Sequence, residues 1–186
     1  MTEPDTSGSA DQARRQAIKV ELRRVEESAT YSAQSQLEQA KRWRTVNLSL
    51  GIPASLLAAI AGVTALAVAA GQVAAGIIAL ISAAFGGVLT TVNAAHRMNQ
   101  ASSAANAYLE IQTAARQARL VDLPYVTLEE ARSALAEITA RRDEQNKTAE
   151  PPSRKAYRKG KKNILTGAQN YAVDEPARTS PPRGPA

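Results

Sequence analysis

The feature that most constrains this chain is a long stretch without charge. Thr45 to Ala95 contains no Asp, Glu, Lys or Arg, although 22% of the whole chain is charged. A helix that crosses the apolar core of a bilayer needs about 20 residues. The 51 residues of this stretch are too many for one crossing and enough for two. The sequence therefore predicts an all-α protein built on a two-helix transmembrane hairpin, residues 45–95, with long helices before and after it.

The hairpin is predicted to turn at Ala69–Gln72, where a glycine weakens the helix and a glutamine is the most polar side chain near the centre. This places the spans at about 46–69 and 73–95, each roughly 35 Å long at ~1.5 Å per residue. Pro53 has no backbone N–H to donate, so the first span is expected to kink or to begin there. A buried hairpin in a soluble fold is the alternative, but a chain of 186 residues cannot enclose two such helices.

Basic residues at the ends of the spans predict their orientation. Lys41, Arg42 and Arg44 precede the first span, Arg97 follows the second, and the turn between the spans carries no charge. Positive residues beside a span favour the cytoplasmic side. The protein is therefore expected to cross the membrane twice with both termini in the cytoplasm, and Trp43 fits an anchor at the interface.

The segments that flank the hairpin have the periodicity of amphipathic helices. Residues 1–10 are expected to be disordered, 11–44 to form one helix, and 96–147 to form further cytoplasmic helices. Three helices with one apolar stripe each can bury these stripes only against each other or against a neighbouring subunit. The stripe residues are Ile18, Leu22, Val25, Ala29, Ala33, Leu37 and Ala40; Ala101, Ala105, Tyr108, Ile111, Ala115 and Ala118; and Leu128, Ala131, Leu135 and Ile138.

Local signals mark where the last two of these helices end and begin. The helix after the second span is expected to stop before Pro124. Thr127 and Glu130 have the spacing of a capping box, in which each side chain bonds the backbone N–H of the other. The last helix is therefore expected to begin after Thr127 and to end near Lys147.

The C-terminal segment, 148–186, is basic and is expected to be largely disordered. Six basic residues lie within nine positions: Arg154, Lys155, Arg158, Lys159, Lys161 and Lys162. Contact with anionic lipid headgroups is favoured, because the chain is already tethered to a membrane. A solvated tail without a partner is the second interpretation. Nucleic-acid binding is the least favoured, because aromatic residues are not interleaved with the charges.

The chain offers no catalytic constellation. His96 is the only histidine and there is no cysteine, so no catalytic triad and no usual zinc site can be assembled. We expect no catalytic, cofactor-binding or metal-binding residue, no cofactor, and no enzyme activity. The spans also lack the ionisable residues that proton relays and ion-coupled carriers use.

Small residues dominate the spans and predict close contact between helices. They recur every fourth position, which allows backbones to approach in lipid and favours a homo-oligomer. The residues in these stripes are Ala54, Ala58 and Gly62 on the first span and Ala75, Ala79, Ala83 and Gly87 on the second. Beside the second stripe lie Ser82, Gly86, Thr90 and Asn93, which could face a narrow pore. Their hydroxyls could equally bond back to their own helix. The opposite side, with Ile77, Ile81, Phe85 and Val88, is suited to lipid.

The order of these segments resembles the SLATT family, bacterial two-transmembrane effector proteins associated with SMODS and SLOG genes. The segments that carry the resemblance are "KRWR", "NLSLGIPASLLAAIAG", "AAHRMNQASSAANAYLEIQTAAR", "TLEEARSALAEI" and "PPSRKAYRKGKKNI", which together cover about Asp11–Ile164. The most recognisable runs are Leu50–Pro53, Tyr108–Arg116 and Ala156–Ile164. Many relatives have a proline soon after the second span. Here the chain reads "VNAAHRM", which favours a continuous helix.

The resemblance implies a membrane effector of bacterial conflict and antiviral defence systems. Such an effector would act in the cytoplasmic (inner) membrane as an oligomeric pore that depolarises the cell after a partner senses infection. It carries over no catalytic residue. The expected partners are membrane lipids, further copies of the chain, and a sensor or nucleotide-signalling protein encoded nearby; nucleic acid is not expected. The alternative is a tether or scaffold that docks a cytoplasmic partner and conducts nothing.

Overall fold

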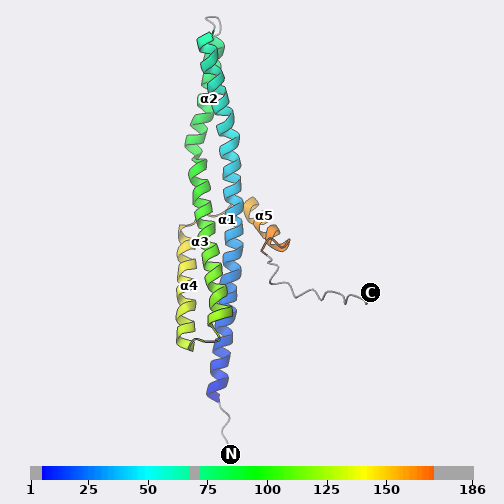
Figure 1. The fold of residues 1–186 in the computed structure, drawn as a ribbon, viewed down its shortest axis with the longest axis vertical. Helices are drawn as coiled ribbons and strands as arrows, with labels where there is room; N and C mark the ends of the chain where they lie inside the picture. The colour runs from blue at the N-terminus through cyan, green and yellow to red at the C-terminus, as the bar shows by residue number, and fades with distance from the viewer. Residues whose placement is uncertain (1–5, 68–71, 170–186) are drawn as a thin grey trace, which may run out of the picture.

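The computed structural model describes residues 6–67 and 72–169, and this part of the chain is helical almost throughout. The longest helix is α1 (Thr6–Ala67), which has 62 residues and runs most of the length of a rod-shaped molecule (Figure 1). α2 (Gln72–Val92) and α3 (Ala94–Gln117) follow one another back along α1 in the opposite direction (Figure 1). One half of the rod is thus the pair α1 and α2, and the other half is a bundle.

Two further helices complete the bundle. After α3 the chain makes a π-helical turn at Ala118–Asp122, and α4 (Leu128–Thr148) returns beside α3 (Figure 1). Residues 149–153 then cross to the other side of α1. There α5 (Arg154–Leu165) lies against α1 near the middle of the rod, away from α4 (Figure 1).

α1 is longer and less interrupted than the sequence suggested. It begins at Thr6, so the expected disorder of residues 1–10 is wrong for residues 6–10, while residues 1–5 lie outside the described part. α1 also continues through Pro53. A start of the helix at Pro53 is therefore excluded: the proline removes one backbone donor, and the turns on both sides remain helical.

The core of the bundle consists of the predicted apolar stripes. On α1 the predicted residues are buried except Leu37, which is half-buried, and on α3 and the π-turn all six are buried. On α4, Ala131 and Ile138 are buried while Leu128 and Leu135 pack partly against the same core. The prediction that the three stripes bury one another is confirmed. Many of these residues are alanines, so the helices can lie close together.

Polar contacts fix the register of the bundle. Arg119 donates to Glu26 Oε2 through Nε at 3.0 Å and Nη2 at 2.7 Å, and both side chains are mostly buried. Arg15 donates to the carbonyls of Leu123 (2.8 Å) and Val126 (2.9 Å), which ties the turn after α3 to α1. Each contact joins segments far apart in sequence, so together they fix the position of α3 along α1.

The end of α3 and the start of α4 follow the sequence signals. The helix stops before Pro124, as expected. Thr127 Oγ1 accepts from the Glu130 N–H, and the Thr127 N–H donates to the Glu130 carboxylate at 2.8 Å, so the capping box is confirmed. α4 ends at Thr148, one residue beyond the predicted Lys147.

The junction between α2 and α3 differs from expectation. Asn93 has φ 48° and ψ 46°, a left-handed conformation that Asn enters more readily than most residues. The Asn93 N–H donates to Leu89 O (2.9 Å) and the Arg97 N–H to Asn93 O (3.1 Å), so hydrogen bonds continue on both sides. The continuous helix expected here is wrong: the second apolar helix ends at Val92 and not near Ala95.

The C-terminal segment is also more ordered than expected. Residues 154–165 form α5, with Ser153 Oγ accepting from the Ala156 N–H as an N-cap. The expectation of a largely disordered tail is wrong for this part, because α5 finds a partner surface on α1. Residues 68–71 and 170–186 lie outside the described residues, and with them all of the predicted turn at Ala69–Gln72 except Gln72, the first residue of α2.

Candidate functional site

The α1–α2 half of the rod exposes a continuous apolar surface. Val73 is 76% exposed and Leu80 73% exposed. Two stretches of the described helices are long and apolar enough to cross a membrane, and only 6% of each most apolar window is buried. Other large apolar side chains exposed there are Leu48, Ile52, Leu56, Ile60, Val63, Ile77, Ile81 and Val88. Extended apolar patches on a protein surface mark sites of contact with a membrane or with another protein.

α2 packs on α1 through a face that the sequence did not single out. The partly buried residues of α2 are Ile78, Ser82, Phe85, Gly86, Leu89 and Val92. Across from them a Cβ added at Gly51 would lie 3.7 Å from the Leu89 side chain. Phe85 was expected to face lipid, and this is wrong. Phe85 is instead partly buried on the same face as Ser82 and Leu89, which contact α1.

The predicted helix-packing residues lie mostly outside the α1–α2 contact. Ala54 is partly buried, whereas Ala58, Gly62, Ala79, Ala83 and Gly87 are exposed. A Cβ at Gly62 or Gly87 would meet no atom within 4 Å. The side chain of Ala75 lies outside the described residues. The described residues of the small-residue stripe, apart from Ala54, therefore lie on the exposed surface of the single chain.

The predicted pore-facing residues have separate environments. Ser82 Oγ donates to Ala54 O at 2.7 Å, so Ser82 faces α1 and joins the two helices. Thr90 Oγ1 donates to Gly86 O at 2.9 Å within its own helix, which was the alternative expected for it. Gly86 is partly buried, and Asn93 forms the junction of α2 and α3. The four residues thus do not form one polar surface in the single chain.

A polar junction lies where the apolar pair meets the bundle. The Arg97 guanidinium lies 5.1 Å from the centre of the Trp43 ring, and Arg97 Nη1 lies 2.7 Å from Glu150 Oε1. Gln36 Nε2 donates to Glu150 O at 2.7 Å. Gln39 Oε1 accepts from Ser153 Oγ at 2.9 Å. These contacts hold the segment between α4 and α5 against α1 and α3, next to the end of the apolar pair.

α5 docks on α1 through small residues. Ala156 is 4% exposed and Gly160 is buried. A Cβ at Gly160 would lie 2.9 Å from the Ser35 backbone N and 3.0 Å from the Gln34 carbonyl carbon. These are backbone atoms of a long helix and cannot move aside as a flexible side chain can. Glycine at this position therefore permits the close approach of α5 to α1.

Glu38 is the electrostatic centre of this contact. Its side chain is 2% exposed, and its carboxylate lies 2.7 Å from Lys41 Nζ and 2.9 Å from Lys159 Nζ. Asn163 Nδ2 donates to Glu38 Oε1 at 3.0 Å. Burial acts to raise the pKa of Glu38, but the hydrogen bonds and charges of the two lysines outweigh it and hold the pKa below its ordinary value of 4.5. A charged Glu38 thus ties α5 to α1.

The structure collects the six predicted lipid-headgroup residues on α5, where all are exposed: Arg154, Lys155, Arg158, Lys159, Lys161 and Lys162. Lys159 reaches back to Glu38. Sequence reasoning missed Glu38, Gln39 and Gly160 as docking residues. The available signals were the concentration of uncharged polar residues around Glu38 (Gln34, Ser35, Gln36 and Gln39) and a glycine in the middle of the basic segment.

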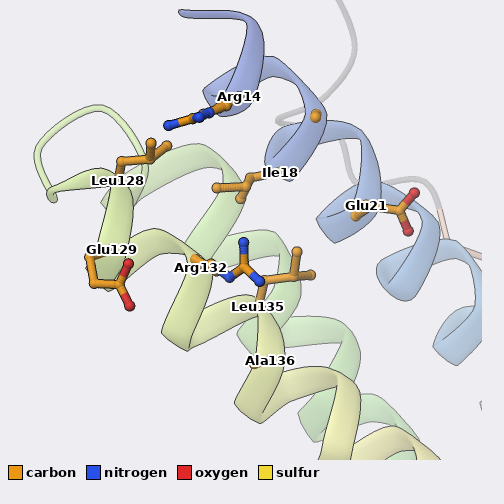
Figure 2. A pocket seen from close by; sticks show the side chains of 9 residues that line it. Arg14, Ile18, Glu21, Leu128, Glu129, Arg132, Leu135 and Ala136 are labelled. Carbon is orange, nitrogen blue, oxygen red and sulfur yellow. The ribbon is translucent and has the colours of Figure 1, made fainter. Parts of the chain in front are cut away.

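A separate groove of about 610 Å³ lies between α1 and α4 at the far end of the bundle (Figure 2). Ile18, Leu128 and Leu135 give it apolar lining, and Arg14 and Arg132 line it as well (Figure 2).

Comparison with protein-family models, with curated proteins and with solved structures finds no significant match to this chain. The resemblance to the SLATT family therefore depends on the sequence segments that carry it.

Proposed function

We propose that this chain is a non-enzymatic effector of a bacterial cytoplasmic membrane, which it crosses twice with both termini in the cytoplasm. Copies of the chain assemble into a pore that depolarises the membrane when a sensor protein or a nucleotide signal acts on the cytoplasmic bundle. The exposed apolar surface of α1 and α2 supports insertion, because lipid would remove large apolar side chains such as Val73 and Leu80 from water.

The observation that carries the proposal is the continuity of α1. One helix belongs both to the bundle and to the apolar pair, without a break at the junction. If α1 shifts or rotates against the other helices of the bundle, the same helix carries that movement into the apolar half. Shifts of packed helices are a known form of conformational switching. The open small-residue stripe of α2 supports assembly, because small residues allow helices to approach in lipid.

A membrane tether that conducts nothing is the second candidate, and one observation favours it. Ser82 and Thr90 are hydrogen-bonded within the chain, so these two hydroxyls are engaged before any pore is built. In that case the bundle would serve to hold a cytoplasmic partner at the membrane.

Cysteine labelling in intact cells tests the insertion. Ser103 and Ser133 are exposed in the bundle, and cysteines there should resist a membrane-impermeant thiol reagent. A cysteine at Gln72, at the end of the predicted turn, should react. Labelling at Ser103 without permeabilisation would contradict the arrangement. Ser35 is unsuitable as a labelling site, because α5 buries it.

Gly87→Leu tests assembly through the small-residue stripe. A Cβ at Gly87 meets no neighbouring element of the single chain, so we expect leucine there to spare the fold and to interfere with a second copy. Overpacking of a tight contact typically costs ~1–3 kcal/mol. Val88→Leu is the matched control, since Val88 is exposed on the neighbouring position.

The readouts are cross-linked oligomers and a voltage-sensitive dye in cells that carry the activating partner. We expect depolarisation by the wild type and Val88→Leu and not by Gly87→Leu. Depolarisation by all three would remove this stripe from the pore. A silent wild type that still recruits its partner would favour the tether.

A further inference from the structure

A basic hollow lies between α1 and α5, beside the charge-free stretch. Its volume is about 230 Å³. It is lined by Lys41, Arg42 and Thr45 of α1 and by Lys155 and Lys159 of α5, together with Ala156 and Glu38. Four cations therefore meet one carboxylate, and the hollow carries a surplus of positive charge.

Not all of this charge is used within the chain. Lys41 and Lys159 share Glu38 between them. Within the described residues, Arg42 and Lys155 take part in no ion pair, and Arg42 lies 5.9 Å from the centre of the Trp43 ring. The two side chains come from helices more than 100 positions apart in the sequence, and they converge only because α5 is docked.

The height of the hollow along α1 identifies the kind of ligand. Thr45 is the first residue of the charge-free stretch, and Glu38 lies about 10 Å before it at ~1.5 Å per residue. The polar headgroup layer extends roughly 5–8 Å beyond each side of the apolar core. In the inserted protein the hollow therefore opens at the depth where lipid phosphates lie.

We propose that this hollow binds the phosphate of an anionic phospholipid headgroup, with Arg42 and Lys155 as its principal ligands. The proposal depends on the membrane insertion argued above, and goes beyond it by assigning a specific lipid site. It differs from a diffuse attraction of basic residues to a charged surface, because the site exists only while α5 lies against α1. Lipid binding would in turn hold α5 in its docked position.

The test uses the full chain in nanodiscs of phosphatidylcholine with a minor fraction of phosphatidylglycerol, and counts retained phosphatidylglycerol by native mass spectrometry. We expect Arg42→Gln with Lys155→Gln to weaken retention by roughly 30-fold, from the loss of two basic residues at the surface. The control, Lys161→Gln with Lys162→Gln, removes the same charge from exposed positions of α5 outside the hollow and should change retention little. An equal loss in both pairs would overturn the site in favour of diffuse attraction.

Gly160→Leu provides an independent variant, because it keeps every charge and displaces α5 from α1. Retention should fall as in the Arg42 and Lys155 pair, and unchanged retention would overturn the proposal. Inorganic phosphate added to pure phosphatidylcholine nanodiscs separates the two sources of phosphate. Equal slowing of amide exchange in α5 by inorganic phosphate and by phosphatidylglycerol would overturn the assignment to lipid. Labelling of a cysteine at Gln72 in the same samples reports insertion separately, so a failure of the lipid site is distinguishable from a failure to insert.

Discussion

Replacing Gly160 with alanine tests the docking of α5 with a single methyl group. In an open helix interior, Gly→Ala stabilises the helix by about 1 kcal/mol. At Gly160 the methyl would lie 2.9 Å from the Ser35 backbone N and 3.1 Å from Gln34 O, and overpacking of this kind costs ~1–3 kcal/mol. The clash is the larger effect, so the contact should weaken by up to ~2 kcal/mol.

Hydrogen exchange of residues 154–165 in the full chain measures this loss. An isolated helix of 12 residues is marginal in water, so α5 should unfold when it undocks. A loss of ~1–2 kcal/mol corresponds to exchange about 5- to 30-fold faster. Rates in α3 and α4 should not change. Lys161→Ala, at the exposed neighbouring position, is the control. Slower exchange in α5 after Gly160→Ala would refute the reasoning. It would show that the higher helix propensity of alanine determines the stability of α5, and that Gly160 does not lie close to the backbone of α1.

Three further predictions concern the bundle. Because the folded pKa of Glu38 lies below its ordinary value, its contribution to α5 docking is complete above pH 4.5 and is lost as the pH falls below that value. Protection of the α5 amides, measured as their exchange rate relative to that of an unstructured chain at the same pH, should fall on acidification, and Glu38→Gln should remove this dependence. Glu26→Gln should lower the free energy of unfolding by ~1–3 kcal/mol, because its two hydrogen bonds with Arg119 are mostly buried. In contrast, the same change at exposed Glu27 should lower it by less than ~1 kcal/mol, and thermal denaturation in detergent would compare the two. Thr127→Ala should cost ~0.5–2 kcal/mol through loss of the N-cap, seen as fraying at the start of α4.

Several features of the fold follow from the sequence because they depend on neighbouring residues. Helical periodicity placed Leu22, Ala105 and Ile138 on buried stripes, since a side chain's position around a helix is set by its spacing alone. The capping box at Thr127 and Glu130 is contained within four residues. The charge-free stretch likewise identified the two helices able to cross a membrane. None of these required knowledge of a distant contact.

Only the tertiary structure decided which surfaces meet. α2 has no charged face, so its sequence does not show which side packs against α1. The helix turns the side with Phe85 toward α1 and leaves Gly87 exposed, and this depends on how the side chains of the two helices fit together. The turn at Asn93 was equally hidden, because Asn is tolerated in a helix as well as in the left-handed conformation.

α5 shows the same limit most clearly. Its charges predicted a largely disordered tail with lipid headgroups as the favoured contact. Its order depends instead on Gly160, which packs against the Ser35 backbone, and on Lys159, which pairs with Glu38 more than 100 positions away. A sequence pattern reports what one segment can do alone. The partner that orders α5 exists only after α1 and the segment following α4 have been brought together.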